Sequence, residues 1–462
     1  MQRRKFIKST IATSILSGSI ASIAGANSVT SNQRPGIYNE PAKDIRIIDE
    51  YDVIVAGAGP AGIAAAISAG REGAKTLLLE AHGCLGGIWT AGYLSWVLDQ
   101  YNKTGLMEEI KSKLVEMDAQ CPIDTGNAFA YDVEKMKLLL EELNMDAGVD
   151  IIFHTRVVEA VKNKKNRLTH LITESKSGRE AWAGKMFIDT TGDGDLAARA
   201  GCGFDFGSEK GDWQPMSMLA LVGGVNFKEI EPYVRYAGDA NFKSKRRLVE
   251  KIVNGGVIPS ILKPGLFPIN NHLFMIMANH EYEYKGMDAR DVTKATLSAR
   301  KELHKVINAL KSHGSEWKNI RLVATPEQIG VREGRRIHGL YTVTQEDLIN
   351  GASFKDAVCR VTFGVDVHST TKKEEEESGN WSRGIKTKDY DIPLRSLIAK
   401  DVAGLMMAGR CISGDFIAHS SYRQTGNAVA MGEAAGKVSA IAAKKNKLPQ
   451  EVSLQEAGLN VG

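Results

Sequence analysis

The stretch YDVIVAGAGPAGIAAAISAGREGAKTLLLE, residues 51–80, decides the fold of this chain. Residues 53–55 are a short apolar run with β-branched side chains, which predicts a buried strand. The Ala- and Ile-rich segment around Gly62 predicts a helix, and residues 76–79 predict a second strand that ends at Glu80. The succession of strand, glycine-rich turn, helix and strand indicates a βαβ unit and therefore the α/β class.

The turn of this unit carries Gly57, Gly59 and Gly62 at G-x-G-x-x-G spacing, with Pro60 and Ala61 between the last two. The first glycine permits a tight turn, the second lets a pyrophosphate approach the backbone, and the third lets helix and strand pack closely. The positive N-terminal end of the following helix favours an anion. We therefore predict a dinucleotide site, with a purely structural turn as the alternative.

Glu80 lies about 20 residues beyond the first glycine, where an acidic side chain accepts a hydrogen bond from a ribose hydroxyl. An acidic residue at this point argues against a 2′-phosphate, so NADP is disfavoured. The motif alone does not separate FAD from NAD.

The first 26 residues have the features of an export signal. The basic run RRKFIK, residues 3–8, precedes a mildly apolar segment that ends in an A-x-A pattern at residues 24–26. This arrangement resembles a twin-arginine signal, so we expect residues 1–26 to direct export to the periplasm and residues 27–45 to form a polar linker. A basic disordered tail or an uncleaved anchor is the alternative. The apolar run is too short and too polar for a stable membrane span.

Charge and cysteine content exclude several classes of function. The formal net charge is +4, and residues 3–8 contain four basic and no acidic side chains, so the remainder is neutral and gives no support for nucleic-acid binding. The five cysteines are scattered, without a C-x-x-C motif. A redox-active disulfide, an iron–sulfur cluster and a cysteine zinc site therefore lose support, and we predict no metal site.

The 462 residues are enough for two domains. Residues 205–320 lack the glycine punctuation of the flanking segments, which favours a second domain inserted into the first. We assign the nucleotide-binding domain to residues 46–112, 132–204 and 386–446. The inserted α+β substrate domain, with some segments on the cofactor side, is assigned to residues 113–131 and 205–385.

Local patterns give further expectations. Helical periodicity predicts a helix over residues 132–147, with Asp132 as its cap, and another over residues 288–312. The charge run KKEEEE, residues 372–377, is expected to be a solvated loop rather than a metal site.

Three separated segments carry a resemblance to a known family. They are the glycine loop with Glu80 and HGCLGGIWTAG (82–92), DTTGDGDLAARAG (189–201), and the stretch from IPLRSL to GDFIAHSSYRQTGNAVAMGEAAG (392–436). Together with residues 324–344 they resemble the FAD-dependent oxidoreductases among the glutathione-reductase-like flavoproteins. The resemblance covers nearly the whole mature chain. It favours FAD and implies a Rossmann-like FAD domain with an inserted substrate domain.

The resemblance also implies which residues contact FAD. The first βα turn would hold the pyrophosphate, Glu80 the adenosine ribose, and Gly86 and Gly87 would run beside the pyrophosphate and flavin. Val157 would lie near the adenine edge. Asp193 would lie by the nucleotide, unless it caps a helix.

At the C-terminal end, the resemblance implies that Asp415 faces the ribityl chain or pyrophosphate. The helix that contains Gly426 and Asn427 would direct its N-terminus at the N1–C2 carbonyl edge of the flavin, where it stabilises the negative charge of the reduced ring. The second dinucleotide motif and cysteine pair of the pyridine-nucleotide disulfide reductases are absent. Electrons are therefore expected to pass through a substrate at the flavin face and an external carrier.

Residues 416–427, FIAHSSYRQTGN, supply candidate catalytic side chains. His419 is the candidate general acid/base, because imidazole titrates near neutrality, and Arg423 is a candidate for binding a carboxylate or other oxyanion. His419 could instead hydrogen-bond the flavin ring or a backbone group. Ser421 and Tyr422 belong to the same polar cluster.

Weaker candidates lie elsewhere. VREGRRIHG contains four polar residues for which structural ion pairs are favoured over a substrate clamp: Arg332, Arg335, Arg336 and His338. His368 is less favoured still. Cys84, in the flavin-side loop, is either a packed thiol or a point of covalent flavin attachment.

These patterns predict an exported FAD-dependent oxidoreductase that transfers a hydride between flavin N5 and a small organic substrate. A reductase supplied by an external cytochrome or quinol is one alternative, and a non-catalytic flavin-binding protein is another. The expected partners are a small-molecule substrate and an external electron carrier, with no nucleic acid.

Overall fold

The computed structural model describes residues 36–121, 128–236, 239, 242–377 and 381–459. The chain divides into a short unit, Met1–Asp44, and a compact unit, Ile45–Gly462, which contains every element below. The expected signal, residues 1–26, lies outside the described residues, and residues 37–45 form neither helix nor strand. None of the helices in the described ranges is long and apolar enough to cross a membrane.

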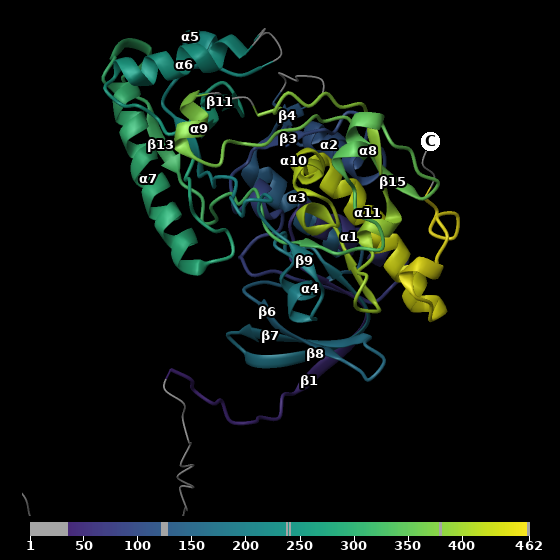
Figure 1. The fold of residues 1–462 in the computed structure, drawn as a ribbon. Coiled ribbons are helices and arrows are strands. Elements are labelled where there is room, and N and C mark those ends of the chain that lie inside the picture. The colour runs from purple at the N-terminus through teal and green to yellow at the C-terminus, as the bar shows by residue number, and fades with distance from the viewer. Residues whose placement is uncertain (1–35, 122–127, 237–238, 240–241, 378–380, 460–462) are drawn as a thin grey trace, which may run out of the picture. The chain divides into compact units, whose positions relative to one another are not determined.

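The compact unit contains a seven-stranded mixed sheet of Rossmann type, of which β1, β6, β7 and β8 are labelled in the lower part of Figure 1. Parallel pairing gives the order β5-β2-β1-β8-β17, and the amino half of β8 pairs antiparallel with β7, which pairs with β6. Residues 53–56 of β1 and all of β2 are buried, as the apolar runs of parallel strands require. The strands are β1 (Ile47–Ala56), β2 (Thr76–Leu79), β5 (Asp150–Ile152), β6 (Arg156–Lys162), β7 (Leu168–Ser175), β8 (Gly178–Asp189) and β17 (Leu405–Met407).

Two helices in this layer touch backbone to backbone. α1 (Pro60–Arg71) is Ala-rich and almost wholly buried, and it packs on α11 (Thr425–Lys445). Cβ atoms on Gly432 and Gly436 of α11 would lie 2.1 and 2.2 Å from the carbonyl oxygens of Ala61 and Ala65. Only glycine permits such an approach, and the rising order of both residue pairs shows that the helices run parallel.

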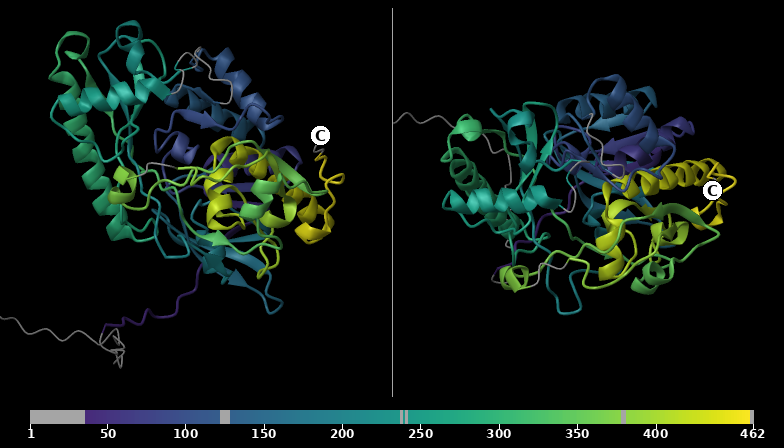
Figure 2. Two further views of the ribbon diagram at one scale, coloured as in Figure 1. Left: turned by 45° about the horizontal axis from the view of Figure 1, so that its top comes forward. Right: turned by 90° about the horizontal axis from the view of Figure 1, so that it is seen from above.

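A second apolar core lies around a four-stranded antiparallel sheet of order β11-β12-β10-β13. Helices α6 and α7, teal to green, lie away from the yellow α11 in Figures 1 and 2. The elements are β10 (Leu219–Gly223), α5 (Phe227–Ile230), α6 (Lys243–Asn254), β11 (Gly265–Pro268), β12 (Leu273–Met277), α7 (Ala289–Lys311) and β13 (Arg321–Ala324).

The remaining elements surround these two cores. They are β3 (Trp96–Leu98), α2 (Leu106–Glu116), β4 (Ala128–Ala130), α3 (Val133–Asp146), α4 (Asp195–Arg199), β9 (Phe204–Asp205), β14 (Arg336–Ile337), α8 (Gln345–Asn350), β15 (Ala357–Val361), α9 (Lys372–Glu377), β16 (Tyr390–Pro393) and α10 (Phe416–Tyr422). Antiparallel pairs join β3 to β4, β9 to β14 and β15 to β16.

Both helices predicted from periodicity are confirmed. Asp132 caps α3 by accepting hydrogen bonds from two backbone amides, and Asp288 caps α7 in the same way. The prediction of a solvated loop at residues 372–377 is wrong, since they form α9. Lys and Glu four positions apart pair along this helix, and the buried Glu375 carboxylate accepts hydrogen bonds from Ser369 Oγ and Trp381 Nε1.

The boundary between the two cores differs from the assigned domains. The sequence patterns assign residues 113–131 to the substrate domain, yet Leu114 and Phe129 are buried in the first core, where β4 pairs with β3 and α2 packs on α3. The second core takes its buried residues from Met216 to Ile329, and Ile337 already belongs to the first.

Candidate functional site

The three motif glycines occupy the turn between β1 and α1. Gly57 has φ of +95°, and its amide donates to the Leu79 carbonyl at 2.8 Å, which binds the turn to β2. A Cβ on Gly62 would stand 1.9 Å from the Gly57 carbonyl oxygen, whereas a Cβ on Gly59 would meet no protein atom within 4 Å. Gly59 is the N-cap of α1 and supplies no side-chain cap, and Pro60 follows it. The helix therefore presents free backbone amides to open space, as an anion requires.

Glu80 is part of this turn although it lies far along the chain. It is 5% exposed. Its carboxylate accepts hydrogen bonds from the Ala58 amide at 2.7 Å and the His82 amide at 2.8 Å. The acidic side chain thereby stands at the carboxyl edge of the sheet beside the glycine turn, where a ribose would pass.

The second glycine pair lies alongside the first loop. The Gly86 amide donates to the Ala58 carbonyl at 2.8 Å, and a Cβ on Gly87 would lie 2.9 Å from Gly59 Cα. Both residues have positive φ, +103° and +53°, which favours glycine. The structure thus brings residues 57–62, Glu80 and the Gly86–Gly87 loop together.

The end of β8 supports the same turn through contacts that the sequence alone does not predict. Thr190 Oγ1 lies 2.6 Å from the Gly57 carbonyl oxygen. The buried Asp189 carboxylate accepts hydrogen bonds from Thr191 and from the Ala197 amide, and burial raises its pKa to about 6. The acidic residue directly before TTGDG is the sequence signal for these contacts.

Val157 and Asp193 lie on segments next to different parts of the turn. The Thr155 amide donates to the Glu80 carbonyl at 2.9 Å, so the chain that enters β6 with Val157 runs beside the end of β2. Asp193 Oδ1 accepts a hydrogen bond from Arg410 Nη2 at 2.6 Å. Because Gly194 is the N-cap of α4, the alternative that Asp193 caps this helix is wrong. Their contacts with a nucleotide stay predictions.

Asp415 is the N-cap of α10. Its Oδ1 accepts from the Ala418 amide at 2.7 Å and its Oδ2 from the Gln345 amide at 2.6 Å. Both oxygens are thus engaged by backbone, and a ribityl hydroxyl would have to share them. Its contact with the cofactor stays a prediction.

The N-terminal end of α11 projects beyond the N-terminal end of α1, its parallel neighbour. Gly432 lies against Ala61, yet α11 begins at Thr425 and α1 begins at Pro60. At 1.5 Å of rise per residue, α11 extends roughly 9 Å beyond the start of its parallel neighbour. A long ligand held at the glycine turn could therefore meet this second helix end with its far part.

Buried polar atoms without partners mark that second helix end. Thr425 Oγ1, Asn427 Nδ2 and both ring nitrogens of His419 have no hydrogen-bond partner among the described residues. Gln424, the N-cap, gives no side-chain cap, and a Cβ on Gly426 would stand 2.3 Å from the Asp99 carbonyl oxygen. Since buried polar groups are almost always hydrogen-bonded, these atoms fit a planar polar ligand such as the flavin N1–C2 edge.

His419 does not have the ionisation expected of it. It is fully buried in α10, and its ring lies perpendicular to that of Tyr422. Burial, followed by the nearby charges of Arg336, Arg423 and Arg410, holds its pKa well below the usual value. The premise that this imidazole titrates near neutrality is therefore wrong. It remains neutral, with one donor and one acceptor nitrogen.

Most of the basic segment at residues 332–338 has structural partners. Arg335 pairs with Asp195 at 2.9 Å, and Arg336 pairs with Glu333 at 2.8 Å while donating to two backbone carbonyls. His338 Nε2 lies 3.1 Å from an Asp205 carboxylate oxygen. Ion pairs thus account for these three side chains, and Arg332 has a different environment.

Arg332 and Arg423 meet at a buried polar cluster that also contains Asp366, His280 and His368. Arg423 Nη2 donates to the Asp366 carbonyl at 2.6 Å and lies 3.4 Å from its carboxylate. The same Asp366 carboxylate lies 3.3 Å from His368 Nε2, and the rings of His368 and His280 are 4.8 Å apart. We call these five residues the arginine–histidine cluster.

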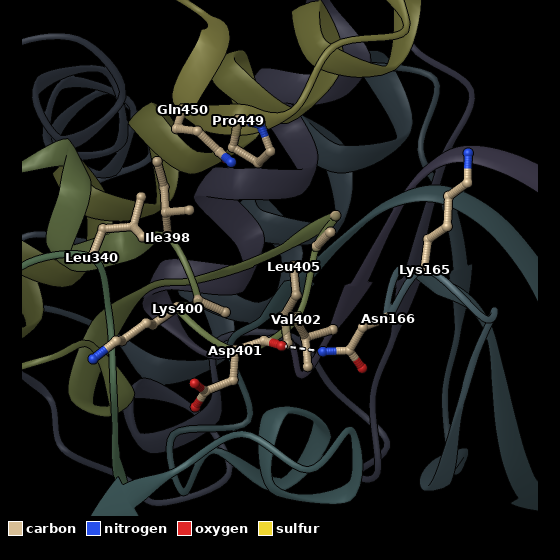
Figure 3. Close-up of a pocket in the computed structure, with 13 residues that line it drawn as sticks. Lys165, Asn166, Leu340, Ile398, Lys400, Asp401, Val402, Leu405, Pro449 and Gln450 are labelled. Carbon is tan, nitrogen blue, oxygen red and sulfur yellow. Dashed lines mark hydrogen bonds between the residues drawn. The ribbon is translucent and has the colours of Figure 1, made fainter.

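Two further features lie apart from these groups. Cys84 is half-buried, burial raises its thiol pKa, and its attachment to flavin stays a prediction. Figure 3 shows a pocket of about 210 Å³ lined by residues that include Asp401 and Leu405. It lies at the amino end of β17, whereas the glycine turn lies at the carboxyl ends of the parallel strands.

The glycine turn, the buried acidic residue and the second helix end together define an α/β dinucleotide-binding protein. The family described as FAD dependent oxidoreductase matches residues 52–458. The chain belongs to this family, so it is an FAD-dependent oxidoreductase and FAD is its cofactor.

Among curated proteins, thiamine thiazole synthase of Methanococcus maripaludis is 26% identical over 207 residues, which cover 41% of this chain and 76% of that protein. The same enzyme of Pyrococcus abyssi is 30% identical over 124 residues, covering 27% and 46%. Among solved structures, a geranylgeranyl bacteriochlorophyll reductase-like protein of Thermoplasma acidophilum has a TM-score of 0.49 at 14% identity, covering 89% of this chain and 82% of that chain. A flavin-dependent brominase has a TM-score of 0.47 at 11% identity, covering 86% and 80%.

Proposed function

We propose that this enzyme transfers two electrons, as a hydride, between flavin N5 and a small organic substrate. We further propose that its FAD domain is of the glutathione-reductase-like subtype. The observation that carries the proposal is the pair of parallel helix N-termini, one at the glycine turn and one roughly 9 Å farther on beside unpaired buried atoms. Bound FAD supplies the redox chemistry, because its N5 accepts or donates hydride.

The residues of this chain bind and orient the cofactor. The open space at Gly59 admits a pyrophosphate to the amides of α1, and the Glu80 carboxylate accepts hydrogen bonds from a ribose. Asn427 Nδ2 can donate to a flavin carbonyl oxygen. The end of α11 adds a partial positive charge there, which stabilises the negative charge of the reduced ring. His419, held neutral, can donate one hydrogen bond without adding a charge.

The test is a visible absorbance spectrum of the purified protein before and after acid precipitation, followed by anaerobic titration with candidate donors and acceptors. We expect flavin bands that leave with the supernatant and bleach with a small organic donor, or return after reduction with an organic acceptor. Flavin retained in the pellet would direct attention to Cys84. Turnover with cytochrome or quinol reductants alone, and no organic donor, would favour the reductase alternative. Failure to bind FAD on reconstitution would overturn the proposal.

We also propose that the protein is exported through the twin-arginine route and passes electrons to an external carrier. Support comes from RRKFIK at residues 3–8 and from the single dinucleotide motif in the sequence. Replacing Arg3 and Arg4 together by Lys should move the protein from the periplasmic to the cytoplasmic fraction, whereas Lys8→Arg should not. Periplasmic recovery of the double variant would contradict this part of the proposal.

A further inference from the structure

The arginine–histidine cluster has more buried positive charge than its own carboxylate balances. Arg332 Nη1 donates to the Pro215 carbonyl at 2.7 Å and to Ser217 Oγ at 2.9 Å, and its Nη2 lies 3.4 Å from His280 Nε2. Among the described residues, no carboxylate oxygen lies within 4.0 Å of this guanidinium. The cluster therefore contains two arginines and one carboxylate, Asp366, and only Arg423 pairs with that carboxylate.

Neighbouring carboxylates have other partners. Glu333 pairs with Arg336 at 2.8 Å, and Glu375 accepts from Ser369 and Trp381. Burial, with the charge of Arg423 close by, lowers the pKa of Arg332 to about 10, so its charge persists at neutral pH. A buried cation without a paired anion is costly, and a bound anion would remove that cost.

The two histidines are neutral and have defined tautomers. Tyr282 donates its hydroxyl proton to the Ser260 carbonyl at 2.9 Å, so it accepts a hydrogen bond from His280 Nδ1 at 3.1 Å. His280 Nε2 is then the acceptor that faces Arg332. His368 donates from Nε2 to Asp366, and burial together with Arg332 lowers its pKa to about 3. Neither ring therefore adds to the positive charge.

Two buried polar atoms beside the cluster have no partner among the described residues: His368 Nδ1 and Gln214 Nε2. The Gln214 side chain lies next to His368, because its Oε1 accepts from the His368 amide at 3.1 Å. Gln214 Nε2 is a donor, which an anionic oxygen would satisfy, whereas Nδ1 of the neutral His368 is an acceptor and requires a donor. The ring of Trp381 packs beside that of His368, with 4.2 Å between the ring centroids.

The cluster is also adjacent to the flavin end of the site. Arg423 is the C-cap of α10, and Thr425, two positions later, begins α11. The other members of the cluster come from three segments. His280 follows β12, Asp366 and His368 follow β15, and Arg332 precedes β14. A molecule held there would lie where the substrate-side elements meet the helix end at which the proposed function places the flavin.

We propose that the arginine–histidine cluster binds the carboxylate of a small organic acid, with Arg332 and Arg423 as its cationic contacts, and that the enzyme's substrate carries such a group. This inference rests on the proposed function. A planar carboxylate matches the fork of a guanidinium, and its oxygens would also accept from the Gln214 amide. The aromatic rings would pack against the organic part of the molecule.

The test measures binding directly on the FAD-loaded protein. Acetate, malonate and benzoate are compared with acetamide, malonamide and benzamide, which have similar shapes and no charge. Binding is followed by the shift in Tm and by the perturbation of the flavin absorbance bands. We expect at least one acid to produce a saturable response at a concentration where its amide produces none. Equal responses to acid and amide, or no response to any acid, would overturn the proposal, as would binding of sulfate in preference to every acid.

The variant Arg332→Gln should weaken binding of the responsive acid by about 10- to 100-fold. The control is Arg71→Gln, which removes an exposed partner of Glu109 and should leave binding unchanged. A folded, FAD-loaded Arg332→Gln protein with wild-type affinity would overturn the assignment. If this variant does not fold, the comparison of acids with amides on the wild-type protein decides the question.

The two proposals fail in different ways. If the protein cannot bind FAD, the proposed function is overturned before any acid is tested. Protein that binds FAD and is reduced by an organic donor, yet discriminates no acid from its amide, retains the proposed function and loses the carboxylate subsite.

Discussion

Gly62 faces the carbonyl oxygen of Gly57 so closely that a methyl group on Gly62 would stand 1.9 Å from it. Gly59, three positions earlier, faces no protein atom within 4 Å. Two glycines of one motif are therefore required for different reasons. Gly62 is needed by the fold of the empty protein, whereas Gly59 is needed by what the protein binds.

Alanine substitutions should separate these two requirements. Gly59 has φ of −68° and ψ of −176°, which alanine adopts freely, so flavin-free Gly59→Ala should melt like flavin-free wild type and lose FAD affinity by tenfold or more, about 1.4 kcal/mol. Gly62→Ala should fold poorly, because the clash is with backbone. Tm of the stripped proteins and flavin content after reconstitution are the measurements. Tight FAD binding by Gly59→Ala would show that the pyrophosphate does not bind at this position.

Glu80→Gln should weaken both the turn and the cofactor site. The carboxylate accepts from two backbone amides, and a carboxamide offers one oxygen and a nitrogen that opposes the second amide. We expect a loss of about 1–3 kcal/mol in the unfolding free energy of the flavin-free protein, and weaker FAD binding. Denaturant unfolding and FAD titration measure the two effects. Glu116→Gln, at an exposed position, should change neither.

Binding of the responsive carboxylic acid should weaken as pH rises through about 8. Burial, followed by the charge of Arg235, lowers the pKa of Lys245 to about 8, and Asp366, Lys263 and Asp239 also act on it. Lys245 Nζ lies 5.9 Å from the centroid of the Trp381 ring, which packs against His368 of the cluster. Lys245 is charged below pH 8 and attracts an anion, and it becomes neutral above that pH. The dissociation constant measured from pH 6 to pH 10 should increase above pH 8 in wild type.

The matched variant for this dependence is Lys245→Met, which should bind the acid weakly at every pH and show no inflection near 8. A pH-independent dissociation constant in wild type would show that the charge of Lys245 does not act on the bound carboxylate.

Glu281→Gln should stabilise the protein at alkaline pH. Burial raises the pKa of Glu281 to about 7 from a usual 4.5, so its ionisation opposes folding. The sign follows from proton binding: the native state holds the proton more tightly, so the penalty is absent below pH 4.5, grows between 4.5 and 7, and is complete above 7. Allowing for partial solvent screening, we expect a gain of about 1 kcal/mol at pH 8 and little at pH 4.5.

Thermal melts of wild type and Glu281→Gln at both pH values measure this difference, with the exposed Glu283→Gln as control. Equal stabilities of wild type and Glu281→Gln at pH 8 would mean that water reaches the Glu281 carboxylate.

The features of the fold and of the site whose residues lie close together in sequence could be predicted. The glycine turn, Glu80 and the caps at Asp132 and Asp288 each follow from patterns within one segment, and all have the local structure expected. What could not be predicted depends on partners that the sequence does not place. The ionisation of His419 was misjudged because composition does not reveal full burial beside three arginines.

The arginine–histidine cluster shows the same limit for a whole group of side chains. Arg332 looks like its neighbours Arg335 and Arg336 in sequence, and only the tertiary fold gives those two a carboxylate and withholds one from Arg332. The helix at residues 372–377 was missed for a related reason, since its buried Glu375 depends on contacts with Ser369 and Trp381.

The contact between α1 and α11 has a consequence for biosynthesis. α1 lies near the start of the described chain and α11 near its end, and their backbones touch without intervening side chains at Ala61 and Gly432. A ribosome must therefore release all of residues 72–424 before the segment of α11 can reach α1. Contacts between such distant segments close slowly. The close contact between α1 and α11, and with it the second helix end of the cofactor site, can therefore form only after residues 425–445 have been synthesised.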